Sequence, residues 1–364
     1  MKLLKPLFLV FACLASLSGL NAQQTRVVTA DKHNDYGLVY SLPLTGVNVR
    51  VKAIKETRIA GPYSQYAKKF LGMANNVVTE NATLYRVAEI SAYTVGLGDD
   101  ADQYIMQLKP GAVTFIELNE NGMLQSINCT SQPSSRLSQS SSREARKESS
   151  IPSVDDYLQY VDMDFISSQS SIKQAEMIAS SLMDVRDSYL ALTRGTADNQ
   201  PSDGRQLELM LNSLRQQELA LTRAFTGVSY TETEEKEFLY IPEKDGTEVL
   251  CRISDIEGFV SPDDYSGVPV YITTEVMLQG RIPTDEMGEE RKMPKDAVVY
   301  VVPGVAKIEV SANDSSFFNQ EMEFSQFGVK FGLNPLLFSD RKERSFARFN
   351  PVTGALVEIG IVKE

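Results

Sequence analysis

Residues 171–227 read SIKQAEMIASSLMDVRDSYLALTRGTADNQPSDGRQLELMLNSLRQQELALTRAFTG, and this stretch decides the fold class. It holds two series of apolar residues at helical spacing: Ile172, Ala175, Ile178, Ala179, Leu182, Val185, Tyr189 and Leu192, then Leu207, Met210, Leu211, Leu214, Leu221 and Phe225. Gly195 and Gly227 follow the two series, where a helix end favours glycine. The pattern predicts two amphipathic helices joined by a short turn as an antiparallel hairpin.

The segment between the two helices is the most distinctive polar stretch of the chain. Its notable residues are Asp198, Asn199, Ser202 and Asp203, with Gly204 at its end. We expect capping here, with Ser202 or Asp203 accepting a hydrogen bond from the backbone at the start of the second helix. The alternative is an exposed recognition turn at the tip of the hairpin.

Both flanks of the hairpin predict β-structure. On the N-terminal side, alternating apolar runs occupy 47–51, 84–95 and 112–118. On the C-terminal side, strand-like runs occupy 238–241, 248–253, 269–277, 297–310, 322–331 and 346–361. Glycine, proline, asparagine and aspartate separate these runs, as in antiparallel sandwiches and barrels. The sequence therefore predicts a mainly β protein with an α-helical hairpin (α+β) and two β-sandwich-like domains.

One short helix is expected on the N-terminal side, at 63–71. Gly61 and Pro62 open it and Gly72 closes it. Its aromatic residues, Tyr63, Tyr66 and Phe70, should pack against the first β domain. An exposed aromatic platform for a carbohydrate or a peptide is the alternative.

Three short matches in the same order raise the possibility of an internal duplication of the β regions. Residues 40–49 match 240–249 in the spacing of Tyr, Gly and Val, and a Pro-Gly pair at 110 and at 303 precedes similar strands. The turn at 118–124 resembles that at 349–356. Hairpin chemistry alone can produce each match, so the duplication stays a hypothesis.

The N-terminus has the three-part layout of a cleaved secretory signal peptide. Lys2 and Lys5 precede an apolar run at 7–17, and Leu20-Asn21-Ala22 is a plausible cleavage site. Lipidation at Cys13 is the alternative. No later segment reaches the ~18 apolar residues of a spanning helix, so we expect no transmembrane span.

These signals divide the chain into five predicted segments. They are a signal peptide (1–22), an N-terminal β domain with one short helix (23–130), a Ser-rich loop or linker (131–154), a helical hairpin (155–228) and a C-terminal β domain (229–364). The serine-rich composition of the third segment cannot bury enough apolar area to offset its ordering entropy.

The chain is acidic, with 36 Lys and Arg against 48 Asp and Glu and a net charge of −12. Losing the two leader lysines would make the charge −14. We therefore expect no nucleic acid among the partners, because nucleic-acid binding depends on basic residues that neutralise phosphates.

Cys129 and Cys251 remain after the leader is removed. They could form a disulfide in an oxidising compartment, or simply be two buried apolar residues.

Few residues suit catalysis. His33 is the only histidine and lies in a polar stretch, which excludes a two-histidine mechanism or a His-based metal cluster. No Gly-rich nucleotide loop or Gly-x-Ser-x-Gly elbow is present. Acidic clusters such as that at 99–102 lie in polar, loop-like stretches. We predict no catalytic, cofactor-binding or metal-binding residue and no cofactor, and keep a carboxylate-dependent glycan hydrolase as the alternative.

Further motifs lie at residues 40–43, 61–72, 195–204 with 207–211, and 350–356. Taken together, they resemble the DUF4831 family of uncharacterised exported Bacteroidetes proteins. The resemblance spans nearly all the mature chain, except the Ser-rich loop, and implies a Gram-negative envelope setting without an activity. We expect a non-enzymatic envelope protein, periplasmic or outer-membrane associated, with a binding or assembly role. Its partner would be another envelope protein or a glycan, and an adhesin-like surface subunit is a further alternative.

Overall fold

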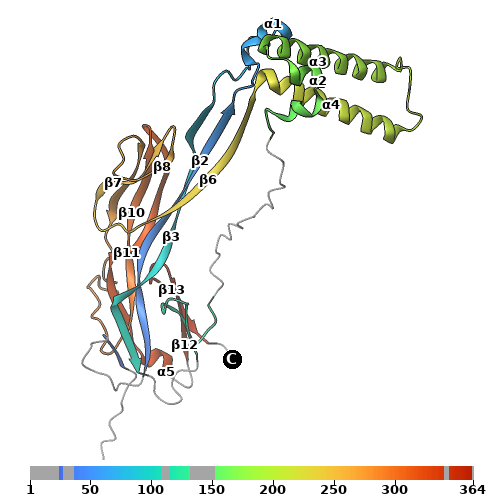
Figure 1. Cartoon of the computed structure of the whole chain (residues 1–364). Helices are drawn as coiled ribbons and strands as arrows, with labels where there is room; N and C mark the ends of the chain where they lie inside the picture. Colours follow the sequence, from blue (N-terminus) through green and yellow to red (C-terminus); the bar gives the residue numbers. More distant parts are fainter. Residues whose placement is uncertain (1–23, 28–36, 108–114, 132–151, 340–343, 363–364) are drawn as a thin grey trace, which may run out of the picture.

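The computed structural model describes residues 24–27, 37–107, 115–131, 152–339 and 344–362. The predicted signal peptide, His33 and most of the Ser-rich segment lie outside these residues. The molecule is elongated, with a β body at one end and a helical hairpin that projects from the other end (Figure 1). Within the described residues, no helix is long and apolar enough to cross a membrane.

Two very long antiparallel strands connect the two ends. Strand β2 (Leu38–Ile59) pairs with β3 (Ala82–Gln107) along almost its whole length. At about 3.3 Å per residue, a 22-residue strand spans about 70 Å. Strand β6 (Val228–Tyr240) pairs with β2, and β1 (Gln24–Val27) pairs with β3. We call this four-stranded layer, in the order β1-β3-β2-β6, the long sheet.

A five-stranded sheet covers part of the long sheet. Its order is β11-β10-β9-β7-β8. The strands are β7 (Gly246–Ser254), β8 (Gly258–Val260), β9 (Val268–Leu278), β10 (Val298–Ala312) and β11 (Ser315–Leu333). Asn313 and Asp314 join β10 to β11 with φ angles of 49° and 57°. Two successive residues with positive φ angles form a tight hairpin turn, and the twist of this turn matches the twist of the paired strands.

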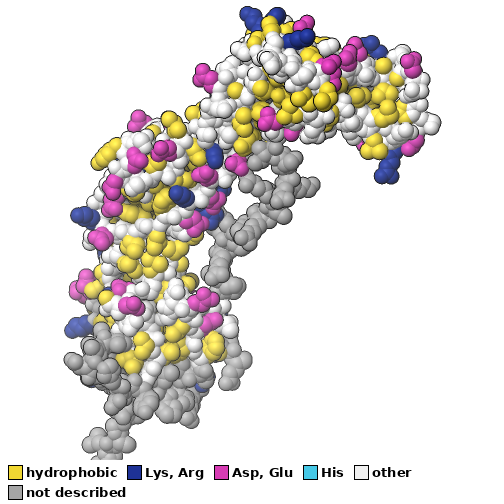
Figure 2. All heavy atoms as spheres, viewed as in Figure 1, with side chains coloured by type: hydrophobic (Ala, Val, Ile, Leu, Met, Phe, Trp, Pro, Cys, Tyr) yellow, Lys and Arg dark blue, Asp and Glu magenta, His cyan; other side chains and the backbone are white. Residues whose placement is uncertain are grey.

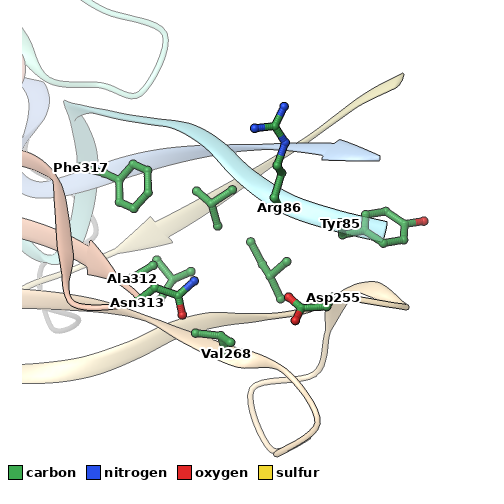
Figure 3. A pocket seen from close by; sticks show the side chains of 10 residues that line it. Tyr85, Arg86, Asp255, Val268, Ala312, Asn313 and Phe317 are labelled. Atoms are coloured by element: carbon green, nitrogen blue, oxygen red, sulfur yellow. The ribbon is translucent and has the colours of Figure 1, made fainter. Parts of the chain in front are cut away.

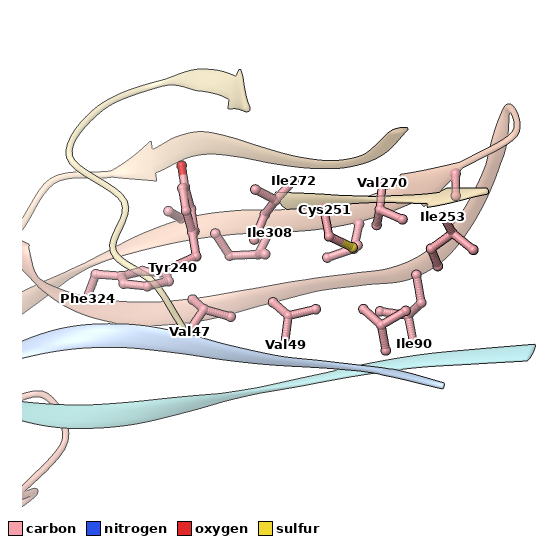
Figure 4. Packing of buried hydrophobic residues seen from close by; sticks show 14 of the residues in the cluster. Val47, Val49, Ile90, Tyr240, Cys251, Ile253, Val270, Ile272, Ile308 and Phe324 are labelled. Atoms are coloured by element: carbon pink, nitrogen blue, oxygen red, sulfur yellow. The ribbon is translucent and has the colours of Figure 1, made fainter. Parts of the chain in front are cut away.

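Alternating side chains of the two sheets form the central core. Val47, Val49 and Val51 of β2 are fully buried and belong to one cluster with Ile272 of β9 and Ile308 of β10. Figure 4 shows Val47 and Val49 facing Ile272 and Ile308 across the two sheets. This alternation is the period-2 pattern that the sequence predicts for half-buried strands. A polar contact also joins the sheets, because the Thr45 and Ser325 hydroxyl oxygens lie 3.1 Å apart.

A third sheet lies at the base of the body, in the order β13-β12-β5-β4, and we call it the base sheet. Its strands are β4 (Ile116–Leu118), β5 (Leu124–Ile127), β12 (Ser345–Phe349) and β13 (Leu356–Ile361), and the short helix α5 (Leu336–Ser339) lies before β12. Buried residues of the base sheet, such as Ile127 and Ala347, share a second core with Tyr40 of β2 and Val299 of β10.

The helices form a third core at the far end of the long sheet. Helices α3 (Ser171–Arg194) and α4 (Gly204–Thr226) are the predicted antiparallel hairpin. The smaller elements are η1 (Ser64–Tyr66), α1 (Ala67–Leu71), η2 (Asp156–Tyr160) and α2 (Met163–Ser167). Tyr63, Tyr157, Phe165 and Phe225 form a cluster of aromatic rings around the base of the hairpin.

The structure confirms a mainly β fold with a helical hairpin, but it does not confirm two separate β domains. Strand β6 from the C-terminal region pairs with β2, and β12 pairs with β5, so both regions share sheets and cores. The duplication likewise stays unconfirmed. The expected packing of the helix at 63–71 on a β domain is wrong, because Tyr63 and Ala67 are buried among the helices.

Candidate functional site

The helical hairpin packs tightly only at its base. The fully or nearly fully buried residues of α3 and α4 concentrate there: Ala175, Ile178, Ala179, Leu182, Ala220, Leu221, Ala224 and Phe225. Toward the tip, Leu192 is the one further buried residue within the two helices. Exposed apolar side chains lie on the same distal half, including Leu209 at 64% exposure and Leu190. Figure 2 shows hydrophobic side chains on the hairpin surface from its base to its tip.

An open groove of about 550 Å³ lies between the distal parts of the two helices. We call it the hairpin-tip groove, and its lining residues are Ser188, Ala191 and Leu192 of α3, Thr196, Ala197, Asp198 and Asn199 of the turn, and Met210, Ser213 and Leu214 of α4. This volume is within the range of ligand sites, about 300–1,000 Å³.

The lining combines an apolar floor with hydroxyl and amide groups. Leu192 is buried, Leu214 is half-buried and Met210 is partly exposed. Asp198 is the one ionisable side chain among the lining residues, and no lysine or arginine lines the groove. An apolar surface with one negative charge favours a partner that is apolar and neutral or basic.

Backbone and side-chain contacts hold the groove in shape. Gly195 ends α3 in the left-handed region with φ of 73°, and the Thr196 amide donates to the Ala191 carbonyl at 2.9 Å. Just below the groove, Arg186 pairs with Glu218 at 2.7 Å, and Arg215 donates to the Tyr189 hydroxyl at 2.7 Å. Both contacts cross from one helix to the other, so they fix the spacing of the groove walls.

The predicted recognition turn divides into two parts. Asp198 and Asn199 line the groove, whereas Asp203 caps α4 by accepting from the Arg205 amide at 3.3 Å. Capping by Asp203 is therefore confirmed, and Ser202 is exposed without lining the groove. The sequence did not identify Met210, Ser213 and Leu214 as groove residues. Met210 and Leu214 have the spacing of residues that pack between the two helices, so the sequence predicted them to lie in that contact.

A second, smaller cavity of about 130 Å³ lies where the five-stranded sheet ends and β3 continues toward the helices (Figure 3). Its walls come from β3, β7, β9, β10 and β11, and they include Val87, Val268, Ala312 and Phe317. Asp255 is its single carboxylate and Arg86 its single basic residue. Each of the two cavities thus offers one carboxylate, whereas glycoside hydrolysis uses a pair.

The family model described as "Domain of unknown function (DUF4831)" matches residues 36–357. The chain belongs to the DUF4831 family. No curated protein and no solved structure matches the chain.

Of the three cysteines of this DUF4831 chain, Cys129 and Cys251 lie within the described residues, and both are free and do not form the disulfide that we considered. Cys251 is buried on β7 in the central core, and burial raises the pKa of its thiol to about 12. Cys129 follows β5 at the base sheet, and its thiol lies 3.5 Å from the Ala347 carbonyl oxygen. The residues belong to different layers, so each thiol is explained by its local packing.

The described part of the chain brings no group of three or more His, Cys, Asp or Glu together in metal-binding geometry. The acidic cluster at 99–102 lies on β3, where Asp102 pairs with Lys330 at 2.5 Å and Asp99 accepts from the Ala101 amide. These contacts give the cluster a structural explanation.

Proposed function

We propose that this protein is a non-enzymatic binding protein of the cell envelope that engages another envelope protein through the hairpin-tip groove. One observation carries the proposal: the groove lies on the distal half of a helical arm, where α3 and α4 stop burying apolar residues. The groove also contains Asp198 and Asn199, which the sequence marked independently as a candidate recognition turn. The secretory leader expected at 1–22 supports the envelope location.

The chemistry of the groove supports a protein partner over a glycan. Among its lining residues are five apolar side chains and no aromatic ring. A sugar-binding site commonly offers an aromatic surface, whereas an amphipathic helix presents apolar anchors to a groove of this kind. Asp198 at the end of the groove would pair with a lysine or arginine of that helix.

The first experiment is capture of crosslinked partners from the envelope, followed by their identification and by reconstitution with the purified partner segment. The variant Ser213→Arg fills the groove with a long side chain on an exposed helical position. Its matched control is Gln216→Arg, one turn further along α4 and outside the groove. We expect Ser213→Arg to abolish capture and Gln216→Arg to retain it.

A second variant tests the charge. Asp198→Asn keeps the shape of the turn and removes the one charge among the lining residues of the groove. We therefore expect weaker binding and a smaller dependence of the affinity on salt.

The proposal fails if Ser213→Arg binds the same partner with native affinity. It also fails if the purified protein cleaves a glycan and loses that activity when an acidic pair is neutralised. Recovery of the intact chain with Met1 in the cytosol would contradict the envelope location.

A further inference from the structure

Strand β13 is an edge strand with an apolar surface. It lies at one end of the base sheet and pairs only with β12 among the described strands. Val357, Ile359 and Ile361 have exposures of 67%, 44% and 57%. They alternate along the strand, and β-branched residues of this kind favour cross-strand packing.

The backbone of β13 offers hydrogen-bonding groups on its open side. The Val362 amide donates to the Arg344 carbonyl at 2.8 Å, which fixes the phase of the antiparallel ladder with β12. Hydrogen-bonded pairs alternate with non-hydrogen-bonded pairs in such a ladder. The pairs 361/345 and 359/347 are therefore of the second kind, and the amide and carbonyl groups of Ile359 and Ile361 point away from β12.

Two common protections of an edge strand are missing from residues 356–361. Natural edge strands commonly carry a lysine or a proline that blocks pairing with another chain. Residues 356–361 contain neither, and their one charged residue, Glu358, is paired with Arg348 of the same chain. The opposite edge of the base sheet, β4, is only 3 residues long, so β13 is the stronger candidate for pairing.

We propose that β13 pairs antiparallel with β13 of a second copy of this chain, in a two-fold arrangement centred on Ile359. In this register Ile359 faces Ile359 of the partner subunit, and Val357 faces Ile361 of the partner subunit. The amide and carbonyl groups of Ile359 and Ile361 lie on the open side, so the two ladders agree in phase, and Val357 is the extra residue at the register shift between the 348/358 and 349/356 pairs. The result is an isologous interface in which two base sheets become one continuous sheet.

The distribution of charge and the length of the overlap select this register. With the centre at Ile359, Glu358 faces Gly360 of the partner subunit, and no like charges lie opposite each other. A centre at Glu358 would place two carboxylates opposite each other, which is unfavourable. A centre at Gly360 would pair only residues 359–361 of the strand, whereas the centre at Ile359 pairs residues 357–361.

The long edge strand β6 is less suited to self-pairing than β13. β6 has 13 residues, and four of them are glutamates, at 232, 234, 235 and 237. Antiparallel pairing of two copies of β6 would bring these carboxylates close together. The proposed interface is independent of the hairpin-tip groove, which lies at the opposite end of the molecule (Figure 1).

Two measurements test the inference. In sedimentation velocity, the native chain should shift from monomer to dimer as concentration rises, and Ile359→Lys should stay monomeric at least tenfold higher in concentration. The control Leu239→Lys changes an apolar side chain of similar exposure, 54%, on β6 and should dimerise like the native chain. Circular dichroism of each variant checks that it is folded, and Ser213→Arg should dimerise normally.

Cysteine crosslinking tests the register without adding a charge. In a Cys129→Ser background, Ile359→Cys should form a disulfide-linked dimer on mild oxidation, since opposite residues of a hydrogen-bonded pair have Cα atoms ~5.5 Å apart. Val357→Cys alone should not crosslink, whereas Val357→Cys combined with Ile361→Cys should. A native chain that is monomeric at every concentration, with no Ile359→Cys dimer, overturns the inference. Equal crosslinking through Val357→Cys alone overturns the register.

Discussion

Tyr40 provides a sharp test of how the base of the body is held together. Its side chain is 1% exposed, and its hydroxyl donates to the Val299 carbonyl at 3.2 Å and accepts from the Val299 amide at 2.9 Å. Strand β9 pairs with β10 only from Val305 onward, so among the described strands this side of β10 has no partner at Val299. The Tyr40 hydroxyl satisfies the two backbone groups that the end of β9 leaves open.

The variant Tyr40→Phe removes the hydroxyl and keeps the ring. It leaves a buried donor and a buried acceptor unpaired, and each unpaired group costs about 1–3 kcal/mol. We therefore expect the free energy of unfolding to fall by about 3 kcal/mol. Burial also raises the pKa of Tyr40 well above its usual range, which keeps the hydroxyl neutral and able to donate.

The assay is urea unfolding followed by circular dichroism, with Tyr300→Phe as the matched control. Tyr300 is also buried in this core, and the described structure records no hydrogen bond for its hydroxyl. The control should change the free energy of unfolding by less than about 1 kcal/mol. If Tyr40→Phe and Tyr300→Phe are equally stable, the hydroxyl does not satisfy β10 and the reasoning is refuted.

Three further predictions concern the other layers. Gly96→Ala should destabilise the chain by more than 1 kcal/mol in urea unfolding, because a Cβ there would lie 2.3 Å from the Pro351 carbonyl oxygen. Phe225→Ala removes a fully buried ring at the base of the hairpin, and a loss of about 3–5 kcal/mol should appear as earlier melting of the helical signal. Cys251, with its pKa raised to about 12 by burial, stays a neutral thiol at pH 8, and a thiol reagent should label it only after unfolding, whereas half-buried Cys129 should react in the folded chain.

The elements were predictable because their signals are local. The spacing of Ile178 and Leu182 with the stop at Gly195 fixes α3, and the alternation of Val47, Val49 and Val51 fixes the buried face of β2. Alternation identifies the face of a strand but carries no information about its neighbour. The pairing of β6 with β2 and of β12 with β5 was therefore not predictable.

The length of strand β3 was also not predictable from the sequence. Gly96 and Gly98 suggest a break in the sequence, yet both lie inside β3, where the turn after β12 approaches Gly96 closely. Glycine in a strand marks such a close approach as readily as a turn.

The candidate site was predictable only in its polar part, since Asp198 and Asn199 stand out in the sequence. Ser213 can be identified as a groove residue only after α3 and α4 are placed.

The long pairing of β2 with β3 and β6 has a mechanical consequence. Its hydrogen bonds lie across the strands, and β2 itself runs from the base toward the helices. A force that separates the two ends of the molecule would act parallel to the strands and stretch many of these bonds at once, in shear. The structure should thus resist tension along its length far better than a load that peels β6 from its edge one residue at a time.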